Sequence, residues 1–216
     1  MIEIKNLNLT IKNKHILSNI NMSLSDGKAY GFVGNNGCGK TMLMKCICGL
    51  IKPSSGEVIV DGRRVGKDDD FIRDAGIIIE TPGFITFYSG FQNLKFLADI
   101  KGKIDDETIR ETMRKCGLDP ALRLSYRKYS LGMKQRLGIS QAIMEDPKYL
   151  ILDEPMNGLD KKGVADVREI LLEMKKKEKT LIISSHNQAD IDYLCDGVFE
   201  IDAGEIVEYR GKNIDG

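Results

Sequence analysis

Gly34-Asn35-Asn36-Gly37-Cys38-Gly39-Lys40-Thr41 lies between an apolar run, Lys28–Val33, and a stretch with helical apolar spacing, Lys40–Leu50. Its glycines let successive backbone N–H groups point at phosphate oxygens, and the start of the helix adds the positive end of its dipole. In such a loop the lysine reaches the β and γ phosphates, and the following hydroxyl ligates Mg²⁺. The sequence therefore predicts that residues Gly34–Met42 form a loop that binds the phosphates of a nucleotide. Thr41 is the metal ligand expected in this loop.

Two adjacent carboxylates, Asp153 and Glu154, end the short apolar run Tyr149–Leu152. If this run is a strand of a parallel sheet, both acids lie at the carboxyl edge, where ligands bind. Asp153 is then expected to hold Mg²⁺ through its water shell, and Glu154 to orient and polarise an attacking water. Two acids after a strand are more often a solvated turn or a helix cap. The phosphate loop upstream favours the catalytic interpretation.

Apolar residues change their period along the chain in a way that predicts an α/β fold. Alternation over Ile2–Ile11 and Ile16–Leu24 predicts half-buried strands, and the nearly all-apolar run at 76–79 predicts a fully buried one. Helical spacing dominates residues 90–146, where Leu94, Leu97 and Ile100 recur on one helix. Further strands are expected at 57–61, 149–153, 180–184, 197–201 and 205–208, with helices at 160–177 and 188–194.

The composition is that of an ordinary globular domain. Of the 216 residues, 42% are hydrophobic and 30% charged, and Lys+Arg and Asp+Glu both number 32, so no global field favours nucleic acid as a partner. No apolar run approaches the roughly 20 residues that a membrane-spanning helix needs. The five cysteines are odd in number and lack framework spacing. They predict reduced thiols and a cytoplasmic location.

Three further motifs carry a family resemblance: Ser130-Leu-Gly-Met-Lys-Gln-Arg136, Asn157-Gly-Leu-Asp160, and His186 after Ile182-Ile-Ser-Ser185. With them, nearly the whole chain resembles the ATP-binding subunits of ABC transporters. The resemblance implies one domain, residues 1–216, with a P-loop NTPase core in which helices flank a parallel sheet. It also implies an N-terminal antiparallel β subdomain and an inserted helical subdomain at about 84–146.

The resemblance also implies how the motifs share their work. Two cassettes would pack head to tail, so that Ser130 and Gly132 of one subunit face the γ-phosphate of ATP held by the phosphate loop of the other. Asp160 belongs to the loop at that interface, and His186 would contact the γ-phosphate from its own side. An ATP-dependent homodimer is therefore expected. Without the resemblance, His186 would ordinarily be interpreted as a capping or core residue.

Several positions depart from the usual family pattern. Ile11 stands where an aromatic residue usually stacks on adenine, so weaker base recognition and tolerance of other nucleotides are expected. Met42 replaces a frequent second hydroxyl. Glu80 stands where a glutamine is usual; with Thr41 and Asp153 it is an expected Mg²⁺ ligand, and its charge would alter the metal dependence. Leu131 stands where the common signature has its first glycine.

Glu80-Thr-Pro-Gly-Phe84 and Ser130-Leu-Gly-Met133 resemble the branch of this family that serves bacitracin export and lantibiotic self-protection. Its members are short ATPases that work with separate membrane permeases. The resemblance implies that the permease contacts the region Glu80–Phe91, which carries four aromatic residues: Phe84, Phe87, Tyr88 and Phe91. An exposed apolar patch usually marks a partner. Packing inside the helical subdomain is the alternative for these side chains.

The predicted function is that of an Mg²⁺-dependent ATPase subunit that powers a permease exporting a peptide antibiotic, a lantibiotic or another amphipathic substrate. The protein would then be cytoplasmic and peripherally associated with the cell membrane. One alternative is a cassette outside transport, such as an iron–sulfur assembly ATPase. A DNA-repair cassette would need a long coiled coil, which the residues between the motifs do not predict. A nucleotide-binding regulatory module without turnover is a further alternative.

Overall fold

The computed structural model of the chain describes residues 1–80 and 83–211. Its N-terminal part contains an antiparallel sheet, in which the sequence alternation places apolar side chains on one face and polar ones on the other. The strand order is β2 (Lys14–Leu24), β1 (Ile2–Ile11), β4 (Ser55–Val60) and β5 (Arg63–Arg64). The predicted antiparallel subdomain is thus confirmed.

A second, mostly parallel sheet forms the centre of the molecule. Its order is β10 (Glu205–Gly211), β9 (Gly197–Asp202), β3 (Ala29–Val33), β8 (Thr180–Ser184), β7 (Tyr149–Asp153) and β6 (Ala75–Ile78). Every neighbouring pair is parallel except β9 and β10. Because β3 and β7 are parallel and both flank β8, the phosphate loop after β3 and the two acids after β7 emerge at the same edge of the sheet, one on each side of β8.

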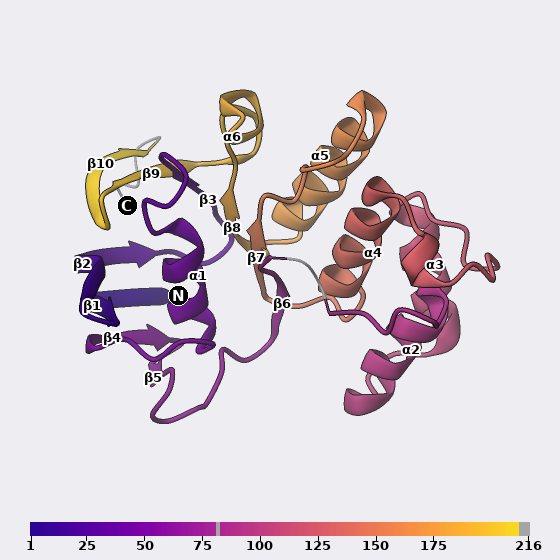
Figure 1. The fold of residues 1–216 in the computed structure, drawn as a ribbon, viewed down its shortest axis with the longest axis horizontal. Helices are drawn as coiled ribbons and strands as arrows, with labels where there is room; N and C mark the ends of the chain where they lie inside the picture. Colours follow the sequence, from indigo (N-terminus) through magenta and orange to yellow (C-terminus); the bar gives the residue numbers. More distant parts are fainter. Residues whose placement is uncertain (81–82, 212–216) are drawn as a thin grey trace.

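The parallel sheet is covered on both faces, which explains why its strands are almost wholly apolar. Tyr149 and Ile151 of β7 pack with helix α1 (Lys40–Cys48) and the antiparallel sheet. Leu150 and Leu152, which alternate with them, pack on the opposite face. The helices on that face are α4 (Leu131–Ile143), α5 (Lys161–Lys176) and α6 (Gln188–Leu194). Figure 1 shows this layered arrangement, with α1 beside the antiparallel sheet and α5 across the parallel strands.

Residues that follow β6 form a helical lobe with its own apolar cluster, on the right of Figure 1. It comprises α2 (Gly90–Lys101), α3 (Asp106–Lys115), a short 3₁₀ turn at Tyr126–Lys128, and the outer side of α4. The predicted helix over Leu94–Ile100 exists, but its buried side carries Leu94 and Ala98. Leu97 and Ile100 are exposed instead. The spacing predicts a helix, whereas the neighbouring helices decide which stripe of it is buried.

The ends of the elements follow local chemistry. Helix α1 ends at Cys48 rather than at the predicted Leu50, because Gly49 adopts a left-handed φ of 81° and terminates it. Helix α2 begins with a capping box between Ser89 and Gln92. Within the parts of the chain that the structure describes, no helix has the length and apolar character that crossing a bilayer requires.

Candidate nucleotide-binding site

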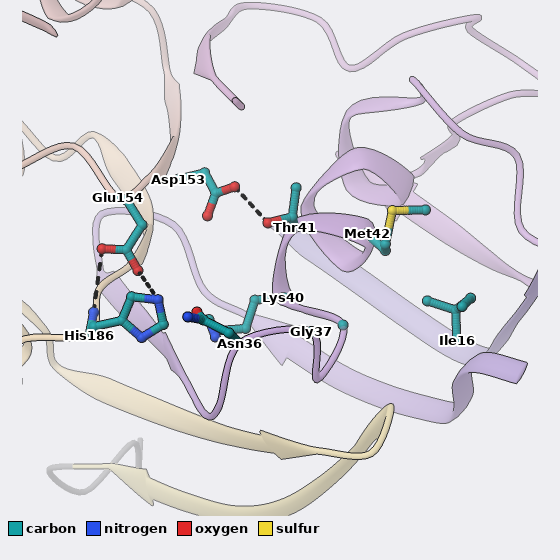
Figure 2. Close-up of a pocket in the computed structure, with 10 residues that line it drawn as sticks. Ile16, Asn36, Gly37, Lys40, Thr41, Met42, Asp153, Glu154 and His186 are labelled. Atoms are coloured by element: carbon teal, nitrogen blue, oxygen red, sulfur yellow. Dashed lines mark hydrogen bonds and ion pairs between the residues drawn. The ribbon is translucent and has the colours of Figure 1, made fainter. Parts of the chain in front are cut away.

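A cavity of about 330 Å³ lies where the phosphate loop meets the carboxyl edge of the parallel sheet. Figure 2 shows that its polar side chains gather at one end and its aliphatic side chains at the other. The lining residues are Ile16, Asn36, Gly37, Gly39, Lys40, Thr41, Met42, Asp153, Glu154 and His186. The structure therefore brings the predicted phosphate loop, both predicted acids and the predicted histidine into one site.

The phosphate loop is shaped by its glycines and wraps around its own lysine. Gly34 has a φ of 140°, and a Cβ there would lie 2.0 Å from the carbonyl oxygen of Ile201, so a side chain is excluded. The Lys40 side chain is buried, and its Nζ donates hydrogen bonds to the carbonyl oxygens of Gly34 at 2.7 Å and Asn35 at 3.1 Å. The ammonium group is thus positioned inside the loop, where phosphate oxygens would be bound.

Asp153 is held from two sides. The Thr41 hydroxyl donates a 2.7 Å hydrogen bond to Asp153 Oδ2, and the Ser184 hydroxyl donates a 2.5 Å hydrogen bond to Asp153 Oδ1. Ser184 Oγ also accepts a hydrogen bond from the backbone N–H of Glu154, at 3.0 Å. The sequence interpretation missed Ser184. The signal was a hydroxyl at the carboxyl end of an otherwise apolar buried strand.

Glu154 and His186 face each other at the polar end of the cavity (Figure 2). His186 Nε2 lies 3.1 Å from Glu154 Oε1, and the His186 backbone N–H donates to Glu154 Oε2 at 3.4 Å. The Nε2 approach is close but poorly aligned, so Oε1 is buried without a hydrogen-bond partner among the described residues. Burial raises the pKa of the Glu154 carboxyl, and the facing His186 opposes this shift only in part. Such a carboxylate is suited to accept a proton.

The other end of the cavity is aliphatic. Ile16 of β2 and Met42 of α1 line it, whereas Ile11, the residue expected beside a nucleotide base, is not among the lining residues. The sequence interpretation missed Ile16 because the position of the turn after β1 decides which residue of β2 reaches the phosphate loop. At this end the cavity would therefore offer a nucleotide base apolar contact area, but no side chain that could form a hydrogen bond with it.

Glu80 lies apart from the other two predicted metal ligands. Its carboxylate accepts a 2.6 Å hydrogen bond from Lys45 Nζ and is largely exposed, and it does not line the cavity. The register still places it at the same edge of the sheet: Ile78 pairs with Leu152, so Glu80 follows β6 at the level where Glu154 follows β7. Thr81 and Pro82, which belong to the motif predicted around Glu80, lie outside the described residues.

Ser130, Gly132 and Asp160 lie away from the cavity but close to one another. Ser130 caps α4 by accepting a hydrogen bond from the Met133 N–H, and Asp160 caps α5 by accepting one from the Gly163 N–H. A Cβ on Gly132 would lie 3.4 Å from the Gly158 carbonyl oxygen. Within one chain, the signature motif Ser130–Arg136 thus lies beside the Asn157–Asp160 loop, and neither segment lines the cavity that contains Lys40.

The two segments are joined by further contacts. Leu131, which replaces the usual glycine of the signature, lies against Gly158, where a Cβ would be 2.5 Å from the leucine side chain. Gln135 Nε2 donates to the carbonyl oxygens of Pro155 at 2.9 Å and Glu154 at 3.3 Å. These contacts connect the first turns of α4 with the segment that leaves β7.

The four aromatic residues predicted as a partner patch divide into two pairs. Phe84 packs edge-on against Tyr126, and Phe91 lies under the Arg110 guanidinium, so both belong to the helical lobe. Phe87 and Tyr88 are near the surface, with ring centroids 5.1 Å apart. Phe96 of α2 extends this surface pair, because its ring centroid lies 5.0 Å from that of Tyr88. Packing inside the helical lobe therefore accounts for Phe84 and Phe91, whereas Phe87 lies exposed at the surface.

Comparisons with known proteins place this chain in one family. Residues 17–157 match the family described as "ABC transporter". YybJ of Bacillus subtilis, an uncharacterized ABC transporter ATP-binding protein, is 44% identical over 95% of this chain and 94% of its own length. The lantibiotic transport ATP-binding protein SrtF of Streptococcus pyogenes is 38% identical over 98% and 93%. The bacitracin transport ATP-binding protein BcrA of Enterococcus faecalis is 38% identical over 96% of this chain and 68% of its own.

The fold agrees with this assignment. A dimeric structure of the ATP-binding cassette MJ0796, in a post-hydrolysis state bound to ADP and Pi, superposes with a TM-score of 0.89 and covers 99% of each chain. Its sequence is only 20% identical, so the likeness shows a shared fold.

Proposed function

The chain belongs to the ABC transporter family, and we propose that it is the ATP-hydrolysing subunit that powers a separate membrane permease. The observation that carries the proposal is the convergence of Lys40, Asp153, Glu154 and His186 in one cavity. A phosphate-binding ammonium, a metal-binding carboxylate and a partly buried proton acceptor are groups suited to hydrolysis of a phosphoanhydride.

The donor set fits a magnesium ion. The described residues contain no group of three or more His, Cys, Asp or Glu side chains placed to hold a metal. Mg²⁺ does not need one, since it is typically bound by one or two protein oxygens together with substrate phosphates and water. Thr41 Oγ1 and Asp153 Oδ2, 2.7 Å apart, would supply these oxygens. Glu80 would join them only after leaving Lys45.

Within this site each residue has a definite task. Lys40 would bind the β and γ phosphates, and a magnesium ion held by Thr41 and Asp153 would neutralise part of their charge. Glu154 accepts a proton from the attacking water, which its raised pKa favours. His186 lies against Glu154 in the lining of the same cavity and would contact the terminal phosphate of a bound nucleotide. Ser184 keeps Asp153 and the Glu154 backbone in register.

We further propose that the active form is a homodimer. Ser130 and Asp160 do not line the cavity of their own chain, although both are at exposed helix starts. A second copy, packed head to tail, would place its Ser130 hydroxyl and the N–H groups of its α4 against the terminal phosphate. The proposal is supported by the dimeric form of the MJ0796 cassette.

The permease would dock on the outer surface of the helical lobe. Phe87 and Ile100 are 71% and 79% exposed, which is unusual for side chains of their size, and Phe96 and Leu97 lie on the same helix as Ile100. This surface extends the predicted region Glu80–Phe91 along α2. Docking there would hold the protein at the cytoplasmic face of the membrane. The names of SrtF and BcrA support an exporter of lantibiotics or related peptide antibiotics.

Two measurements test the proposal. Glu154→Gln should bind ATP and dimerise with it, while phosphate release falls by at least about 10²-fold. Wild-type turnover in that variant would contradict the role of Glu154. Ile100→Lys should abolish recovery of the protein with its permease from solubilised membranes, whereas Val207→Lys, which changes an exposed aliphatic side chain on β10, should not. Equal recovery of both variants would contradict docking on α2.

A further inference from the structure

A buried carboxylate is hydrogen-bonded to Ser185, the residue that precedes His186. Asp190, at the start of α6, has a side chain that is only 3% exposed. Its Oδ1 accepts hydrogen bonds from Arg168 of α5, from Nε at 2.8 Å and from Nη2 at 2.5 Å. Its Oδ2 accepts a hydrogen bond from the Ser185 hydroxyl at 3.1 Å. No step of the proposed chemistry uses this group.

Ser185 passes this anchoring on to the backbone around His186. The Ser185 Oγ that donates to Asp190 also accepts a hydrogen bond from the Asn187 N–H at 3.1 Å. The Asp190 N–H in turn donates to the Asn187 carbonyl oxygen at 3.0 Å. Ser185, on one side of His186, is thus bonded directly to the buried carboxylate, and Asn187, on the other side, is linked to it through the Ser185 hydroxyl. The imidazole itself is exposed and faces Glu154.

We propose that Asp190, held by Arg168, is a positioning residue that fixes His186 against Glu154 through Ser185. The inference rests on the proposed function, because it takes His186 to act on the bound nucleotide. Its physical basis is that a carboxylate is buried only where charge and hydrogen bonds compensate it, which restricts it to one geometry. The Arg168 guanidinium supplies two of those bonds in a planar fork from a long, well-packed helix.

An ion pair between α5 and α6 also has a simpler interpretation, as a fastening of two helices that affects stability alone. The two interpretations differ in one respect. If Asp190 acts through His186, breaking its link to Ser185 lowers kcat only while the His186 imidazole is present. In a His186→Ala background the same change should leave kcat as it is. If the pair only stabilises the fold, any change in kcat that follows from breaking the link is independent of His186. The loss of kcat then multiplies with the loss caused by His186→Ala.

The test is a double-mutant cycle with Ser185→Ala and His186→Ala in the full chain. Ser185→Ala breaks the connection to Asp190 without leaving a buried charge unpaired. We expect it to lower kcat about tenfold, because small displacements of a catalytic group carry costs of that order or more. We expect His186→Ala to lower kcat about 10²-fold, and the double variant to match His186→Ala within threefold. ADP affinity, which does not involve the terminal phosphate, should stay within threefold in all three.

Two additional variants separate positioning from folding. Arg168→Met/Asp190→Leu replaces the ion pair by apolar side chains of similar volume, an exchange that folded proteins often tolerate; it should remain folded yet show the kcat loss of Ser185→Ala. Asp192→Asn, an exposed acid on the same helix, should behave as the wild type. Multiplied effects in the Ser185/His186 cycle, or full activity of the apolar pair, would overturn the inference. Full activity of His186→Ala would instead refute the proposed role of His186.

Discussion

Ser184 and Asp153 are joined across neighbouring parallel strands by a 2.5 Å hydrogen bond, at positions that the β7–β8 register places opposite each other. The same Ser184 oxygen accepts a hydrogen bond from the Glu154 backbone N–H. We predict that Ser184→Ala lowers kcat about tenfold and raises the Mg²⁺ concentration needed for half-maximal activity. The reason is that Asp153 and the Glu154 backbone both lose the hydrogen bond to the Ser184 hydroxyl. Phosphate release measured across a magnesium titration checks this.

Thr180 provides a matched control for that variant. It lies at the other end of β8, is equally buried, and its hydroxyl accepts a hydrogen bond from the Gly27 N–H. Thr180→Val should therefore destabilise the fold by about 1 kcal/mol, since it leaves the partly buried Gly27 N–H without this acceptor. Its kcat per folded molecule should not change. Equal losses of kcat in the two variants would mean that Ser184 has no specific role.

The raised pKa of Glu154 predicts a pH-dependent cost to stability. A carboxyl whose pKa is higher in the folded state than in the unfolded state destabilises the fold wherever it must be ionised. The cost is present at neutral pH and disappears as the pH falls below the unfolded value of about 4.3. Glu154→Gln should therefore raise Tm at pH 7.5 in buffer without nucleotide or magnesium. The gain should shrink towards pH 4, and a gain that is constant with pH would contradict this account.

The Lys45–Glu80 ion pair should be easy to break. Both groups are near the surface, where such pairs contribute about 0–1 kcal/mol. If Glu80 ligates magnesium, Lys45 competes with the metal for it. Lys45→Met should then lower the Mg²⁺ concentration for half-maximal nucleotide binding by several-fold, with little change in Tm. The effect should vanish in a Glu80→Gln background, and its persistence there would exclude Glu80 as a ligand.

Gly76 marks the place where β6 touches the backbone of α4. A Cβ at this position would lie 1.8 Å from the Ala142 carbonyl oxygen, which cannot move without shifting the helix. Gly76→Ala should thus lower the free energy of unfolding by about 3 kcal/mol. Gly83→Ala is the control, because nothing lies within 4 Å of its added Cβ. Urea denaturation of both variants checks the difference, and similar midpoints would contradict the close approach.

The sequence predicts best what depends on neighbouring residues. The phosphate loop needs only its own glycines and the helix after it, so Lys40 and Thr41 lie where their spacing predicts. Asp153 and Glu154 follow from one apolar strand. Ser184 and Ile16 could not be predicted in the same way, since strand register and turn position bring them to the site from distant segments.

Side-chain direction was the other limit of the sequence interpretation. Helical spacing located α2, but contacts with α3 and α4 decided that Leu94 is buried and Ile100 exposed. The charge of Glu80 was evident, yet its partner Lys45 lies 35 residues away on another element. Such pairings depend on how elements pack, which local propensity does not encode.

The aliphatic end of the cavity has a consequence for how well the protein would distinguish one nucleotide from another in a cell. Ile16 and Met42 line this end. They would contact a bound base only through apolar area, whereas discrimination between purines requires directional donors and acceptors. Affinity would then come mainly from the phosphates and the metal, and the relative abundance of ATP and GTP would decide which one is turned over. The same tolerance should make base-modified fluorescent nucleotides faithful reporters of binding to this site.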